Sequence, residues 1–150
     1  MKDRLKRAGW KLPFFLLCAG YVSFLLMAKV LGRHALTTLA DGTISHDPTL
    51  WRQLSAVPFV LTLLAGFLLF RKTPQRDLLC SAAVAAALSA VFSLLSLEQI
   101  TVFTWLSSYM IYWCDFGCSY LFHLLPTDWL YMIATWCLPF IFVPFGQKGG

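Results

Sequence analysis

The chain alternates between long apolar runs and short polar segments. Five stretches carry no Lys, Arg, Asp or Glu: Leu12–Ala28, Gln53–Phe70, Leu78–Leu97, Gln99–Cys114 and Trp129–Gln147. Each is close to the 17–25 residues that a helix needs to cross a bilayer. The two-residue alternation of a membrane-spanning strand is missing from them. The pattern therefore predicts an all-α integral membrane protein, a small polytopic helical bundle that forms a single transmembrane domain over residues 1–150.

The last apolar region is too long for one span. Residues 100–145 would form a helix of roughly 70 Å, whereas the hydrocarbon core is about 30 Å thick. We expect the break at Leu125-Pro126-Thr127-Asp128, because Pro disfavours helix at the residue before it and Thr127 or Asp128 can cap the next helix. The sequence therefore predicts five spans with the C-terminus outside. They lie at about 12–31, 53–70, 78–97, 100–124 and 129–145, with an outer loop at 32–52.

A four-span arrangement is the alternative. Thr101–His123 would then lie in the outer interface, or enter the membrane and return, and the tail would be cytoplasmic. The positive-inside rule mildly prefers this count, because the 126–128 loop has no basic residue. Five spans are favoured because a re-entrant backbone exposed to lipid leaves its polar groups unpaired.

The distribution of Lys and Arg residues predicts how this bundle is oriented in the membrane. Of the 150 residues 59% are hydrophobic and 13% charged, with a net charge of +5. In a membrane protein such a charge indicates topology signals and anionic-lipid contacts at the basic N-terminus rather than nucleic acid. The first eleven residues hold five of the twelve basic residues and Arg71–Asp77 holds three, against three near the outer loop. We therefore predict that the N-terminus and the 71–77 turn are cytoplasmic, in a bacterial inner membrane.

Small residues recur every four positions in the third predicted span. Such ridges allow helix backbones to approach closely, either within the protein or against another membrane protein. In the fourth span, polar residues share one helical face. Together they define the predicted partner or packing face, which consists of Ser81, Ala82, Ala85, Ala86, Ser89, Ala90, Ser93, Thr104, Ser108, Asp115 and Ser119.

Three ionisable residues, Asp115, His123 and Asp128, lie in or beside the apolar region after residue 100 and form a predicted polar site. An ionisable group at membrane depth is a functional hypothesis by default. In the five-span arrangement Asp115 would lie near the cytoplasmic headgroups, paired with Lys11, Arg71 or Arg76, or would contact a cation, a proton or a partner's arginine. One ridge of the predicted helix carries Asp115, Ser119 and His123 in succession. Residues in such a row do not converge on one substrate atom, so no catalytic residue is predicted.

Thiol chemistry is the competing interpretation. Cys114 and Cys118 are four residues apart and do not form a C-x-x-C pair, and in the five-span arrangement no cysteine lies in an outer loop, where exchange has access. A membrane thiol-redox enzyme or small carrier using Asp115, His123, Cys114 and Cys118 remains the alternative function. No cofactor and no metal are predicted, because the spacing of the outer-loop residues His34, Asp41, His46 and Asp47 matches no ligand pattern.

These features favour a non-enzymatic inner-membrane protein that acts by helix-to-helix contact with an integral membrane protein or a membrane-inserted toxin. In size, cytoplasmic N-terminus, lack of catalytic motifs, and an outer loop followed by a basic inner turn, the chain resembles the small immunity proteins that block pore-forming bacteriocins. The resemblance implies a partner within the membrane and carries over no functional residue. An exclusion protein or an accessory subunit of a membrane complex belongs to the same class, and an oligomer is compatible with it.

Overall fold

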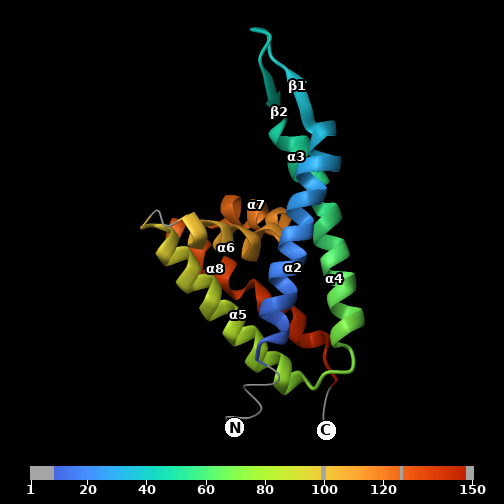
Figure 1. The fold of residues 1–150 in the computed structure, drawn as a ribbon, viewed down its shortest axis with the longest axis vertical. Helices are drawn as coiled ribbons and strands as arrows, with labels where there is room; N and C mark the ends of the chain where they lie inside the picture. The colour runs from blue at the N-terminus through green and yellow to red at the C-terminus, as the bar shows by residue number, and fades with distance from the viewer. Residues whose placement is uncertain (1–8, 99–100, 126, 148–150) are drawn as a thin grey trace.

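The described part of the chain is mostly helical. The computed structural model describes residues 9–98, 101–125 and 127–147, with the backbone alone described at 120–123. Within these ranges four helical segments are long and apolar enough to cross a membrane: Lys11–Ala35, Pro48–Phe70, Gln75–Ser96 and Asp128–Phe145. The fold is thus all-α in its main body and compatible with a membrane protein (Figure 1).

The first of these segments is continuous. Helix α2 (Lys11–Leu26) passes directly into a π-helical turn, η1 (Met27–Leu31), and a 3-10 turn, η2 (Gly32–Ala35). The helix predicted over residues 12–31 is confirmed. Its start is secured by Ser81, whose hydroxyl accepts a hydrogen bond from the Leu12 amide and donates one to the Gly9 carbonyl, both at 3.0 Å. One distant side chain therefore satisfies backbone groups that a helix N-terminus leaves unpaired.

A β-hairpin projects from the end of the molecule opposite the start of α2 and the 71–77 turn (Figure 1). Strands β1 (Leu36–Thr38) and β2 (Ile44–His46) pair antiparallel. The turn between them contains Gly42 at a φ of 82°, which glycine adopts without strain. The strands were not predicted, because three residues are too few to show an alternating pattern.

The second span contains a break. Asp47 caps helix α3 (Pro48–Leu54) by accepting hydrogen bonds from the amides of residues 49 and 50, and α4 (Ala56–Phe70) follows after Ser55. Pro58 has no N–H to donate to the carbonyl of residue 54, which weakens helical continuity at this point. The predicted span over 53–70 is therefore confirmed as helix and begins earlier than predicted.

The continuous fourth span predicted over residues 100–124 is wrong. Helix α5 (Gln75–Ser96) is followed by two separate helices, α6 (Thr101–Tyr112) and α7 (Asp115–Leu124). At about 1.5 Å per residue, α6 and α7 are roughly 18 and 15 Å long, about half the thickness of the hydrocarbon core. Figure 1 shows α6 running crosswise to α2. The five-span count is not confirmed, and the four long segments correspond to the alternative count.

Side-chain hydrogen bonds add to the backbone bond from the Cys114 amide to the Ile111 carbonyl, at 2.8 Å, where α6 ends. The indole N–H of Trp113 donates to the Met110 carbonyl at 2.8 Å, and the Cys114 thiol donates to the Ile111 carbonyl at 3.0 Å. Carbonyls at a helix C-terminus need such partners. Helix α7 then begins at Asp115, where a carboxylate interacts favourably with the helix dipole.

The chain returns to the end at which it began. Helix α8 (Asp128–Cys137) continues as a 3-10 helix, η3 (Leu138–Phe145), and Thr127 caps α8 as predicted. The Gln147 amide donates to the Thr73 carbonyl at 2.9 Å, and the Gln75 amide donates to the Gln147 carbonyl at 3.1 Å. Residue 147 therefore lies at the basic 71–77 turn. The prediction that the C-terminus lies on the opposite side of the membrane from this turn is not confirmed, because residue 147 pairs with residues 73 and 75.

The core forms where α2, α5, α6 and η3 meet. Trp113 and Phe142 are its largest fully buried side chains, with ring centroids 5.4 Å apart. Helix α6 packs directly on α2 at Gly20, where a Cβ atom would lie only 2.7 Å from the carbonyl carbon of Tyr109. Glycine at this position therefore permits a backbone-to-backbone contact that a side chain would prevent.

Candidate functional site

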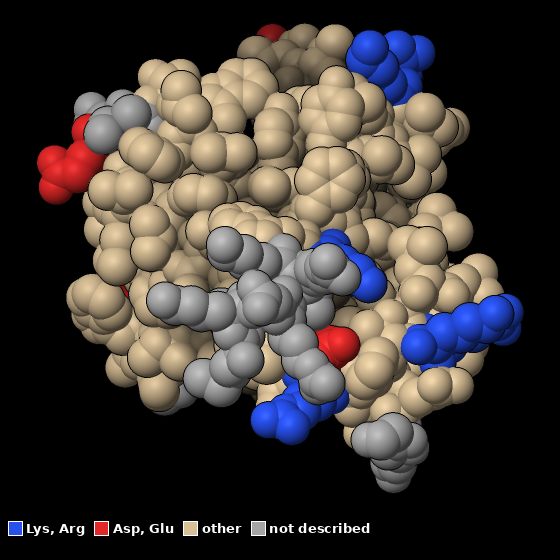
Figure 2. Space-filling model, turned by 60° about the horizontal axis from the view of Figure 1, so that its bottom comes forward, with Lys and Arg blue, Asp and Glu red and all other residues tan. Residues whose placement is uncertain are grey.

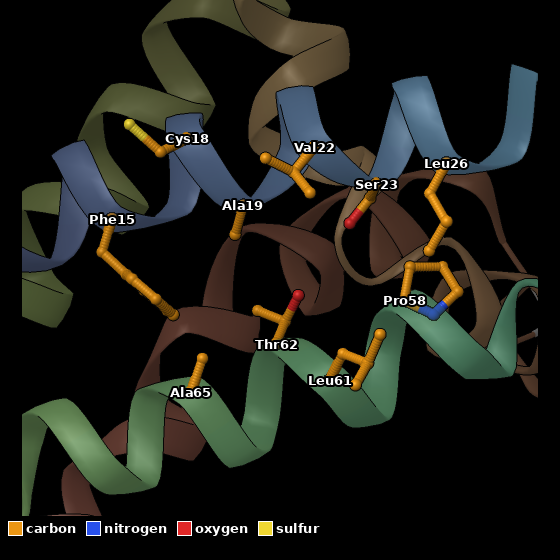
Figure 3. A pocket seen from close by; sticks show the side chains of 10 residues that line it. All are labelled: Phe15, Cys18, Ala19, Val22, Ser23, Leu26, Pro58, Leu61, Thr62 and Ala65. Atoms are coloured by element: carbon orange, nitrogen blue, oxygen red, sulfur yellow. The ribbon is translucent and has the colours of Figure 1, made fainter. Parts of the chain in front are cut away.

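A groove of about 310 Å³ lies between α2 and α4 (Figure 3). Residues three or four positions apart on each helix line it, so each helix contributes one face. The lining residues are Phe15, Cys18, Ala19, Val22, Ser23 and Leu26 from α2, and Pro58, Leu61, Thr62 and Ala65 from α4. Cys18, Val22 and Leu61 are exposed, so the groove opens on the outer surface of two potential spans.

Two hydroxyl groups interrupt the apolar walls of the groove. Ser23 and Thr62 face each other from opposite helices, and their oxygen atoms point into the space between them (Figure 3). Their residues are only 2% and 6% exposed, respectively. The groove was not predicted, because the small-residue pattern of the sequence is pronounced only in the third predicted span. The available signal was the four-residue step from Ala19 to Ser23 and from Pro58 to Thr62.

One end of the groove lies close to basic residues. Lys11 precedes Phe15 by one helical turn, and Arg71 and Lys72 follow the last residue of α4. At about 1.5 Å per residue, Lys11 is roughly 6 Å along the axis from Phe15, and Arg71 is roughly 9 Å from Ala65. The three basic side chains are exposed. Figure 2 shows Lys and Arg side chains distributed around this end of the molecule.

Asp115 belongs to a different cluster, at the hairpin end. Its carboxylate accepts a hydrogen bond from the indole of Trp51 on α3, and burial raises its pKa above the usual range. The Trp51 ring also lies edge-on to the His46 ring, with centroids 4.9 Å apart, and packs against Gly32. The predicted position of Asp115 at the basic end, paired with Lys11, Arg71 or Arg76, is therefore wrong. Through these contacts Trp51 joins the hairpin, α3 and α7.

The two cysteines of the alternative function are buried and contact each other. The Cys114 and Cys118 sulfur atoms are 3.5 Å apart, and Cys118 lies 4.0 Å from the Thr135 hydroxyl. The residues are 1% and 2% exposed, and burial raises the pKa of the Cys114 thiol. Thiol exchange requires an accessible thiolate, so the arrangement disfavours exchange at this pair. Cys18, Cys80 and Cys137 are exposed free thiols.

The predicted packing face is divided by the fold. Its members on α5 pack partly inside the protein, where α5 meets α2, α6 and η3. Ser81, Ala82, Ala85 and Ser89 are buried, whereas Ala86, Ala90 and Ser93 are half-buried. Ser93 contacts Ser107 of α6, with hydroxyl oxygens 3.3 Å apart. The exposed face of α5 instead carries Ala83 and Ala87, which the prediction did not include.

The remaining predicted residues do not gather in one place. Thr104 and Ser108 lie on α6, where the Ser108 hydroxyl donates to the Thr104 carbonyl at 2.8 Å, and they line a smaller hollow beside Phe24. Ser119 is half-buried on α7, and Asp128 is exposed in the first turn of α8. The side chain of His123 lies outside the described residues. The predicted polar site of Asp115, His123 and Asp128 therefore stays a prediction.

The polar residues of the outer loop have local structural partners. The Asp41 carboxylate accepts hydrogen bonds from the amide and hydroxyl of Thr43, which lower its pKa, and Asp47 caps α3. Among the residues that the structure describes, no three or more His, Cys, Asp or Glu side chains are close enough together to hold a metal ion.

Comparison with protein-family models, with curated proteins and with solved structures gives no significant match. The class of the protein is therefore defined by its own fold. It is a small α-helical protein with four segments that are able to cross a membrane by length and composition, and with a lateral groove between the first two.

Proposed function

We propose that this is a non-enzymatic membrane protein that acts by binding an apolar molecule within the bilayer, in the groove between α2 and α4. The observation that supports the proposal is the groove itself. Its volume of about 310 Å³ falls at the lower end of the range for ligand pockets, and such pockets combine apolar walls with a few polar groups. Several lining residues are exposed, so in a bilayer spanned by α2 and α4 the groove would open to the hydrocarbon region.

The size of the groove favours a chain-like occupant over a helix. Its wall on α2 extends from Phe15 to Leu26, which corresponds to roughly 16 Å along the helix axis. A helix with its side chains is about 10 Å across, which is wide for a groove of this volume. An extended hydrocarbon chain is narrower and fits this shape better.

The contacts of the ionisable and nucleophilic groups that an enzyme would use also support a non-enzymatic function. Asp115 accepts a hydrogen bond from Trp51, and Cys114 and Cys118 contact each other in the core. These contacts give each group a structural role. The groove, in contrast, has two hydroxyls directed into open space and no structural role of its own (Figure 3).

We also propose a bacterial inner membrane with the N-terminus in the cytoplasm. The positive-inside rule supports this orientation, because Lys11, at the start of α2, and the basic 71–77 turn lie at one end of the described part of the chain, and the sequence before α2 holds four more basic residues. The pairing of residue 147 with residues 73 and 75 places that part of the chain at the same end.

Contact with another membrane protein is a second candidate, favoured by the outer side of α5. Ala83 and Ala87 are exposed there and Ala86 and Ala90 are half-buried, so a neighbouring helix could approach closely. The partner would be an integral membrane protein or a membrane-inserted toxin. An Ala87→Leu variant that folds normally but loses a co-purifying membrane protein would favour this candidate.

The groove proposal is tested by filling it. Ala65→Phe places a ring in the groove, while Leu64→Phe changes the adjacent, exposed position on the same helix and serves as the control. Each protein is purified in mild detergent and extracted with organic solvent, and the apolar molecules released per protein are quantified by mass spectrometry. We expect the Ala65→Phe protein to release fewer molecules than the wild type and the control. Equal release from all three proteins would refute the proposal.

A further inference from the structure

We infer that the groove holds one acyl chain of an anionic phospholipid, whose phosphate lies among Lys11, Arg71 and Lys72. The inference rests on the proposed function, because it names the occupant of the same groove. Two features of the structure carry it: the apolar channel along α2 and α4, and the positive charge at one end of that channel.

The positions of the charged residues suit a phospholipid headgroup. Lys11 lies roughly 6 Å beyond Phe15, and Arg71 lies roughly 9 Å beyond Ala65, along their helix axes. A phosphate attached to a chain that leaves the groove at this end would therefore emerge among exposed ammonium and guanidinium groups. Such groups form charge-assisted hydrogen bonds with phosphate, and each contributes to attraction of anionic lipid.

The net charge at this end is positive. Arg76 adds a fourth exposed basic residue, and Asp77, half-buried in the first turn of α5, is the only acidic residue described within 9–15 and 65–78. Four positive charges against one negative charge give a local charge of +3. A zwitterionic headgroup gains less from this environment than an anionic one, so the bound lipid should be selected by headgroup charge.

The hydroxyls of the groove distinguish an acyl chain from other apolar ligands. An acyl chain offers no hydrogen-bonding atom at the depth of Ser23 and Thr62. Each hydroxyl can instead rotate and bond to the carbonyl one turn earlier in its own helix. Thr62→Val removes the hydroxyl and makes the groove wall more apolar, so labelling by an acyl chain should increase. A ligand that carries a polar group at this depth, such as a sterol or a quinone, would lose affinity in the same variant.

The experiment places the full-length protein in phosphatidylcholine vesicles containing a minority of phosphatidylglycerol. Either lipid carries a photoreactive diazirine in its acyl chain. After irradiation, peptide mass spectrometry identifies the labelled residues. We expect phosphatidylglycerol to label residues 15–26 and 58–65 in preference to phosphatidylcholine. Replacing Arg71 and Lys72 by Gln, both exposed, should lower that preference about fivefold for each charge removed.

The variants separate failure of this inference from failure of the proposed function. If Ala65→Phe abolishes labelling in the groove by both lipids while the Arg71→Gln/Lys72→Gln protein keeps the wild-type preference, the groove function stands and the anionic-lipid inference is wrong. If Ala65→Phe labels like the Leu64→Phe control, both are wrong. Reduced labelling of the Thr62→Val protein would refute the acyl chain as the occupant.

Discussion

The crossing of α6 over α2 predicts a large effect of adding a single methyl group at Gly20. A Cβ atom there would lie 2.7 Å from the carbonyl carbon of Tyr109, whereas ordinary contacts begin at 3.4 Å. The Tyr109 carbonyl oxygen would lie closer still, so Gly20→Ala would force the two backbones apart by more than the 0.7 Å that the carbonyl carbon alone requires, and neither can rotate away as a flexible side chain can. Overpacking of this kind costs about 1–3 kcal/mol.

A second glycine supplies the matched control. Gly117 lies in α7, and a Cβ atom there would meet only the Phe59 ring at 3.8 Å, an ordinary contact. Both Gly→Ala changes gain about 1 kcal/mol of helix propensity. The difference between the two variants therefore isolates the overlap with α6, and we expect Gly20→Ala to be less stable than Gly117→Ala by about 1–3 kcal/mol.

Thermal unfolding in one detergent, followed by circular dichroism, measures this difference. For a chain of this size, about 1 kcal/mol corresponds to roughly 2–4 °C in Tm. Gly20→Ala should therefore melt several degrees below Gly117→Ala. If the two proteins melted together, α6 would not cross α2 at Gly20, and the placement of α6 across the bundle would be wrong.

Two further predictions concern the hairpin end and the orientation. Burial raises the pKa of Asp115, so its stability contribution is fully present below the unfolded pKa of about 3.9 and is lost as pH rises through the folded pKa. Asp115→Asn should remove this pH-dependent loss of stability, whereas Asp115→Leu should cost about 1–3 kcal/mol by leaving the Trp51 N–H unpaired. Thermal melting between about pH 4 and 8 measures both effects. Wild-type stability that rises with pH as Asp115 ionises would contradict the predicted direction. With native cysteines replaced, an impermeant thiol reagent should label Gly42→Cys but not Pro74→Cys in intact cells, and the reverse result would invert the orientation.

Local chemistry explains which parts of the fold were predictable. The apolar runs located the four long segments, and Pro126 and Thr127 marked the start of α8. The end of α6 was not predictable by the same reasoning, because no Gly or Pro lies there. It depends on hydrogen bonds from the Trp113 and Cys114 side chains to carbonyls that a continuous helix would use itself.

The candidate groove illustrates a different difficulty. Its two walls come from helices separated by the whole hairpin, and each wall alone is an ordinary apolar stripe with a few small residues. Only the packing of α2 against α4 leaves space between them. Similarly, Asp115 and Trp51 are far apart in the sequence, and the fold that joins them depends on the break before α7.

The pairing of Gln147 with Thr73 and Gln75 has a consequence for the order in which the protein assembles. Helices α2, α4 and α5 can enter a membrane before residue 147 has been synthesised. Until then the turn between α4 and α5 lacks the two backbone hydrogen bonds to residue 147. A chain cut after Phe145 would keep all four long segments and lose the hydrogen bonds between Gln147 and the turn. Proteolysis near the C-terminus, or a bulky fusion there, would therefore act first on the turn that follows α4, next to the basic end of the groove.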